Sequence, residues 1–79
     1  MTIRKNIATS DEGFIFNPAT GDSFTTNPLG AEIITLLKED KKLPDIILAI
    51  CEKYEVEEAQ FEKDLDDFVS QLKESSIME

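Results

Sequence analysis

The 79-residue sequence has no histidine and no tryptophan, and it contains one cysteine and three glycines. Without histidine, the usual general base, the Ser-His and Cys-His pairs and the commonest metal ligand are missing. The single Cys51 excludes an internal disulfide and a cysteine-based zinc site, and three scattered glycines form no phosphate-binding loop. The carboxylates show no calcium-loop spacing. We therefore expect a binding module, not an enzyme, with no cofactor and no metal site.

The chain is also short of long apolar runs. None approaches the ~20 residues of a membrane span, and residues 1–9 lack the apolar region of a secretory signal. Cys51 falls on a predicted apolar face, which fits a small core residue in a reducing compartment. We expect a cytoplasmic protein with no membrane partner, folded as a single domain over residues 1–79.

Basic residues are few, and the charge is unevenly distributed. The net charge is −9, and residues 31–79 hold fourteen acidic against six basic side chains, so nearly all of the excess lies there. Such a surface repels phosphate backbones and attracts basic partners. We therefore expect no nucleic-acid partner.

Residues 1–26 carry the signals of a small antiparallel meander. A first strand is predicted over residues 3–8. Phe14-Ile15-Phe16 is β-prone and apolar on both faces, which predicts the middle strand of the sheet. Residues 23–26 alternate around Phe24 and predict the third strand. A sheet of this size is marginal alone and needs helices on one face.

Residues 27–79 predict a three-helix unit. Asn27 is a good cap residue and Pro28 suits a first helical position. Apolar residues then recur at the helical spacing in three segments, which are 28–38, 43–54 and 57–74. The middle helix is expected at the centre of the unit.

The element order β-β-β-α-α-α predicts an α+β fold, winged helix-turn-helix-like, with an N-terminal three-stranded antiparallel sheet followed by three helices. A winged helix suggests DNA binding through its third helix, but here that helix is acidic and would repel phosphates. Asp22-Ser23-Phe24 partly matches the Asp-Ser-Leu motif whose serine carries the prosthetic group in acyl carrier proteins. That motif lies at the start of a helix, and no helix is predicted to begin at Ser23.

Five stretches of this sequence resemble the PqqD family. Phe14-Ile-Phe, Thr20-Gly-Asp and Thr26-Asn-Pro-Leu-Gly-Ala-Glu-Ile-Ile-Thr-Leu-Leu are similar to the family's strand pair, Gly turn and first helix. Leu43-Pro-Asp-Ile-Ile-Leu-Ala-Ile-Cys-Glu-Lys-Tyr and Phe61-x-x-Asp-Leu-x-x-Phe-Val-x-x-Leu are similar to its second and third helices. The resemblance covers about Ile3 to Ile77. The sequence departs from the family at Thr26, where Leu is frequent, and at Ser75-Ser76, where a Gly usually stands; both leave the subfamily and its peptide open.

The resemblance implies a function in peptide recognition. Members of the family bind the leader segment of a ribosomally synthesised precursor peptide and present it to a modifying enzyme, often a radical-SAM enzyme, as PqqD does in pyrroloquinoline quinone biosynthesis. The leader adds as a strand to the edge of the third strand, in the groove beside the third helix. On this chain the implied peptide-binding residues are Ser23, Phe24, Thr25, Thr26, Asp64, Asp67, Phe68 and Gln71.

Other interpretations of these residues remain open. The third strand can be an ordinary edge protected by polar side chains, and Phe68 can belong to the core. Acidic residues flank the apolar face of the third helix, with Glu58, Glu62 and Asp66 on one side and Asp64 and Asp67 on the other. They can be a solvated surface or can dock a basic protein, which makes an acidic protein–protein adaptor the alternative function. An exposed strand edge offers free N–H and C=O groups to an extended peptide, and this favours leader binding.

Overall fold

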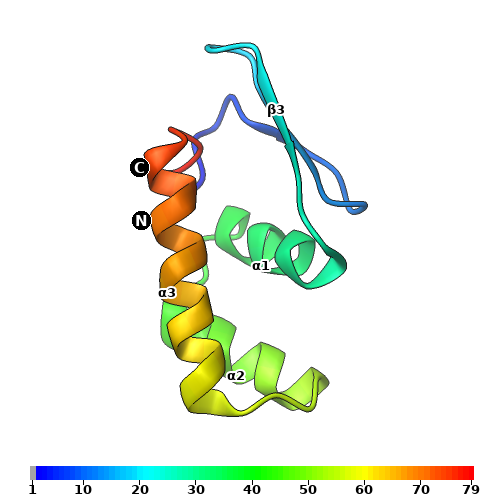
Figure 1. Cartoon of the computed structure of the whole chain (residues 1–79), viewed down its shortest axis with the longest axis vertical. Helices are drawn as coiled ribbons and strands as arrows, with labels where there is room; N and C mark the ends of the chain where they lie inside the picture. The colour runs from blue at the N-terminus through cyan, green and yellow to red at the C-terminus, as the bar shows by residue number, and fades with distance from the viewer. Residues whose placement is uncertain (1) are drawn as a thin grey trace.

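A computed structural model describes residues 2–79 and places three strands before three helices (Figure 1). The strands β1, β2 and β3 form one antiparallel sheet in that order, and they span Ala8–Thr9, Phe14–Asn17 and Asp22–Thr25. The helices α1, α2 and α3 span Pro28–Lys38, Leu43–Lys53 and Glu58–Glu74. The α+β fold with an N-terminal three-stranded sheet and three following helices is confirmed.

The first strand lies later in the chain than the predicted residues 3–8, so that prediction is wrong in its position. Ile3 makes an isolated bridge with Met78 instead, and the Arg4 N–H donates to the Ile77 carbonyl oxygen at 2.9 Å. Ile3 and Ile7 are both buried without a regular strand between them. The two ends of the chain consequently lie side by side (Figure 1).

β2 is the middle strand, as predicted, but only one of its faces is covered. Ile15 is 4% exposed and faces the helices, whereas Phe14 and Phe16 are 57% and 44% exposed on the other face. The pattern follows from the strand geometry, because successive side chains point to opposite faces of a sheet. The apolar character of both faces therefore does not mean that both are buried.

The first helix begins where its cap residue predicts. Asn27 accepts a hydrogen bond at Oδ1 from the Gly30 N–H at 2.8 Å, and Pro28 is the first residue of α1. Ile46 and Ile50 of α2 are buried, but α1 lies between the sheet and α2 (Figure 1) and buries more of its length, with Ala31, Ile33, Ile34 and Leu37 all buried. The prediction that the middle helix is the central one is therefore wrong. One core joins the sheet, the three helices and both terminal segments, with buried side chains from Ile3 through to Met78.

The turn from β3 into α1 is tightly packed around Thr26. The Thr26 N–H donates to the carbonyl oxygen of Gly13 at 2.8 Å. Gly13 has a φ of +97°, a conformation that glycine adopts at no steric cost. Gly30, in the first turn of α1, lies directly against the Thr26 side chain, and a Cβ built there would be 3.1 Å from Thr26 Cβ and still closer to its Oγ1. This packing fixes where the edge of β3 lies relative to α1.

Candidate binding groove

β3 has a free edge whose backbone groups can be assigned from the register. The sheet pairs Ile15 with Phe24 and Phe14 with Thr25, and the Thr26 N–H bonds to Gly13. Hydrogen-bonded and non-hydrogen-bonded pairs alternate in an antiparallel ladder. Phe24 therefore bonds to β2, and the N–H and C=O groups of Ser23 and Thr25 point away from β2. No strand among residues 2–79 covers that side of β3.

Two hollows lie beside this edge, between the sheet, α1 and α3. The first hollow has a volume of about 240 Å³ and is lined by Thr26, Asn27, Leu29, Gly30, Ile33, Phe61, Asp64, Leu65 and Phe68. The second hollow has a volume of about 280 Å³ and is lined by Ile15, Phe24, Thr25, Thr26, Phe68, Gln71, Leu72, Ser75 and Ile77. Thr26 and Phe68 line both. We call the pair of hollows, with the free edge of β3, the groove.

Most of the residues that the resemblance implied lie in the groove. Six line the hollows, which are Phe24, Thr25, Thr26, Asp64, Phe68 and Gln71. Asp67 lines neither hollow, and Ser23 contributes to the groove through its backbone only, since its side chain lines the opposite face of the sheet. Sequence reasoning missed the apolar walls from α1 and the start of α3, because those residues follow the helical period and read as core. That they border a hollow as well as the core is a tertiary feature with no local signal.

Asp64 is the charged residue of the groove. Gln60, one turn earlier on α3, donates from Nε2 to Asp64 Oδ1 at 3.0 Å. Phe68 follows one turn later and is half-buried. These i, i+4 positions lie on one side of α3, so this helix presents a carboxylate and an aromatic ring along the groove, with the Gln60 amide bonded to the carboxylate.

The titratable groups with shifted pKa values lie away from the groove, at the contact of α1 with the end of α2. Glu32 accepts hydrogen bonds from Lys53 Nζ and from the Tyr54 hydroxyl, both at 2.7 Å. The bond from Lys53, then that from Tyr54, lowers the pKa of Glu32. The same bonds raise the pKa values of Lys53 and Tyr54. This cluster ties α1 to α2, which places it among the interactions that hold the scaffold of the groove.

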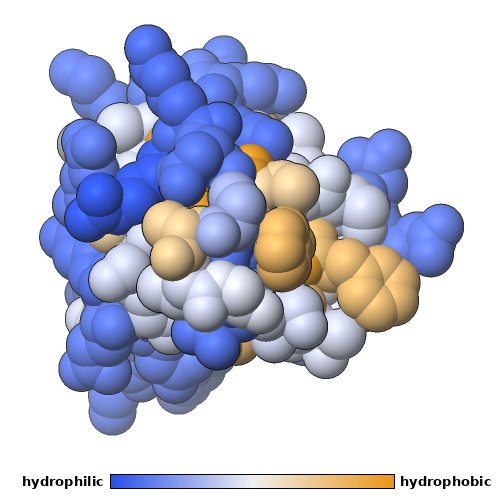
Figure 2. All heavy atoms as spheres, turned by 90° about the horizontal axis from the view of Figure 1, so that it is seen from above, coloured by the Kyte–Doolittle hydropathy of each residue, from blue (hydrophilic) through white to orange (hydrophobic). Residues whose placement is uncertain are grey.

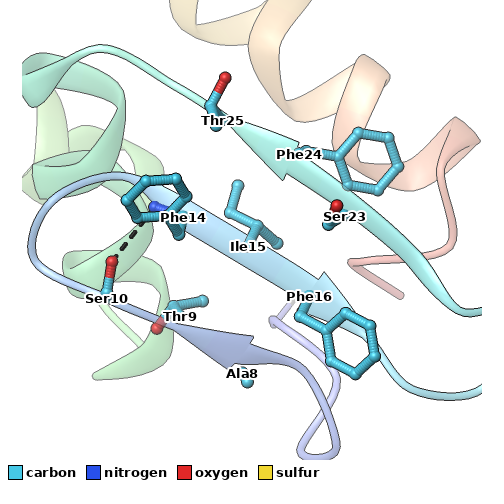
Figure 3. A pocket seen from close by; sticks show the side chains of 9 residues that line it. All are labelled: Ala8, Thr9, Ser10, Phe14, Ile15, Phe16, Ser23, Phe24 and Thr25. Atoms are coloured by element: carbon cyan, nitrogen blue, oxygen red, sulfur yellow. Dashed lines mark hydrogen bonds between the residues drawn. The ribbon is translucent and has the colours of Figure 1, made fainter.

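The face of the sheet turned away from the helices carries a third hollow (Figure 3). It measures about 410 Å³ and is lined by Ala8, Thr9, Ser10, Phe14, Ile15, Phe16, Ser23, Phe24 and Thr25. Figure 3 shows Phe14 and Phe16 standing out from β2 on this face. Seen from above in Figure 2, hydrophobic atoms gather on the right of the view, which is the sheet side in Figure 1, and hydrophilic atoms cover most of the remaining surface. We call this surface the outer face.

Within residues 2–79 the structure shows no group of three or more histidine, cysteine, aspartate or glutamate side chains placed to hold a metal ion. In the same part of the chain, no helix is long and apolar enough to cross a membrane. Cys51 is a free, half-buried thiol that packs against the core. The groove and the outer face are two features of the described structure that suit an interaction.

The chain is similar to one protein family and to two solved structures. Residues 12–77 match the family model described as Coenzyme PQQ synthesis protein D (PqqD). A solved structure described as TbiB1 in complex with the TbiA(beta) leader peptide is 30% identical, with a TM-score of 0.93 over 100% of this chain and 95% of that one. A second, described as lasso peptide synthetase B1 complexed with the leader peptide, is 26% identical, with a TM-score of 0.85 over 98% of this chain and 94% of that one. No curated protein matches the chain. The chain belongs to the PqqD family.

Proposed function

We propose that this protein binds the leader segment of a ribosomally synthesised precursor peptide in the groove and presents it to a peptide-modifying enzyme, without catalysis of its own. Both solved structures that match the chain over nearly its full length are complexes with leader peptides. The leader adds as a strand to the free edge of β3, with α3 on its other side. The proposed setting is the cytoplasm, where precursor peptides are synthesised.

The free edge of β3 is the observation that carries this proposal. Ser23 and Thr25 offer unpaired N–H and C=O groups, and their small side chains leave the approach open. Side chains of an added strand alternate between two faces, so every second residue of the leader points toward the hollows beside α3. Backbone hydrogen bonds then supply affinity and the hollows select the sequence.

The outer face is the proposed contact for the modifying enzyme. Phe14 and Phe16 are exposed side by side on β2, and the face continues across Ser23 and Thr25 to the strand that receives the leader. An enzyme that covers these rings therefore touches the bound leader as well.

Titration of the isotope-labelled protein with the leader of the precursor peptide encoded next to it tests the function. We expect NMR shifts concentrated on residues 22–26 and 60–71. Thr25→Pro removes an N–H from the free edge while the ladder to β2 keeps its bonds. One lost hydrogen bond should weaken binding by about two- to tenfold. Thr25→Ala keeps the N–H and is the control; equal affinity of a folded Thr25→Pro variant would refute strand addition at this edge.

The alternative function, an acidic adaptor that docks a basic protein through α3, is tested by charge reversal. Glu62 and Asp66 are exposed on α3 and line neither hollow. Replacing both with Lys should abolish binding to an adaptor's partner, whereas leader addition to β3 should change only modestly. Loss of leader binding in this variant, together with wild-type binding by Thr25→Pro, would favour the adaptor.

A further inference from the structure

The two hollows of the groove differ in charge. Asp64 is the only charged residue among those that line the first hollow, while the second hollow is lined by apolar groups, hydroxyl groups and Gln71. The remaining wall of the first hollow is largely apolar, with side chains from Leu29, Ile33, Phe61, Leu65 and Phe68. A carboxylate beside an apolar wall suits a ligand with an apolar stem and a cationic end.

The Asp64 carboxylate has capacity left for such a ligand. Gln60 donates one hydrogen bond to Oδ1, whereas an ionised carboxylate can accept about four. Within residues 2–79 the ion pair that the structure contains joins Lys53 to Glu32, so no cation of this part of the chain lies on Asp64. The net charge of −9 further favours a basic ligand.

We propose that the first hollow is a subsite for one lysine or arginine side chain of the leader, with its methylene groups against Phe61 and Phe68 and its cation on Asp64. The inference rests on the proposed function, because it assigns the chemistry of one leader position in the same groove. It narrows the ligand class to leaders with a basic residue at one fixed position and an apolar residue at the position that enters the second hollow.

The subsite discriminates against uncharged side chains because they would leave the Asp64 carboxylate without a partner. An apolar residue in the first hollow fills the space but covers part of the Asp64 carboxylate without supplying a donor. Covering a charge without a partner is unfavourable. A lysine or arginine makes the same apolar contact and adds a charge-assisted hydrogen bond. The subsite therefore selects by penalising neutral residues as well as by attracting basic ones.

A display library of random 15-residue peptides, panned on the full chain, tests the subsite without a known leader. Three proteins are compared: wild type, Asp64→Asn and Asp66→Asn. Asp66→Asn removes the same charge from the same helix but lines neither hollow, so it is the matched control. Enriched peptides are then mapped on the protein by NMR. Wild type and Asp66→Asn should enrich lysine or arginine at one position, and Asp64→Asn should not.

The affinity of one enriched basic peptide completes the test. Its Kd should rise about two- to fivefold in Asp64→Asn and stay unchanged in Asp66→Asn. Changing the basic residue to norleucine should weaken binding to wild type and not to Asp64→Asn. Groove-binding peptides without a basic preference would overturn the subsite and leave the proposed function standing, as would equal losses in both variants. A library that yields no peptide shifting residues 23–26 would overturn both.

Discussion

Replacing Gly30 with alanine tests the packing that positions β3. The new methyl group would enter the space held by Thr26, whose Cβ and Cγ2 lie 3.1 and 3.2 Å from the ideal Cβ position and whose Oγ1 lies nearer still. Either the Thr26 side chain turns or the end of β3 moves away from α1. Both responses change the groove, because Thr26 lines both hollows.

Two opposing effects set the magnitude. Alanine favours a helix over glycine by about 1 kcal/mol. Inserting a methyl group into a packed site costs about 1–3 kcal/mol. We expect a net loss of about 1 kcal/mol in the free energy of unfolding, which corresponds to a fall in Tm of about 4–8 °C for a domain of this size.

Urea unfolding of four proteins measures the effect: wild type, Gly30→Ala, Thr26→Ala and the double variant. Thr26→Ala removes Oγ1 and Cγ2 and leaves Cβ at 3.1 Å, so Gly30→Ala should cost much less in that background. The cycle should therefore give a coupling energy of about 1 kcal/mol or more. If Gly30→Ala stabilises wild type, or shifts both backgrounds equally, the contact does not restrain β3 and the reasoning is wrong. Leader affinity, measured on the same proteins, should fall in Gly30→Ala and recover in part in the double variant.

Three further predictions concern other parts of the structure. Phe14→Ser with Phe16→Ser should leave the leader Kd unchanged and slow peptide modification in a reconstituted reaction; unchanged modification would exclude the outer face as the enzyme contact. Because bonding in the folded state lowers the pKa of Glu32, its stabilising effect is present above the ordinary glutamate pKa and is lost as pH falls through the lowered value. Urea midpoints across the acid range should therefore converge for wild type and Glu32→Gln. Asn27→Ala should cost about 1 kcal/mol of unfolding free energy, measured by the same method, since it removes the cap on the Gly30 N–H.

The helices were predictable because their signals are local. The Asn27-Pro28 start and the apolar spacing of α2 depend on residues within a few turns of each other. The first strand was misplaced because Ile3 pairs with Met78 at the other end of the chain, and no pattern near Ile3 indicates this.

The candidate site was predictable only in outline. Resemblance pointed to the third strand and third helix, but the sequence does not show which N–H groups of β3 are free, since this depends on the pairing of Thr26 with Gly13. Phe14 and Phe16 are residue types typical of a buried strand. Their exposure follows from the helices covering only the other face of the sheet, which the sequence does not show. The helical period puts Asp64 and Asp67 on the same flank of the third helix, yet of the two only Asp64 lines a hollow.

Phe68 lines both hollows. A side chain that enters one hollow presses on the same ring that bounds the other, so the size of one peptide residue sets the room left for its neighbour. Preferences at the two peptide positions should consequently be interdependent. A recognition rule for this groove has to be written for pairs of residues, and scores obtained by scanning one peptide position at a time will misjudge peptides in which both positions change.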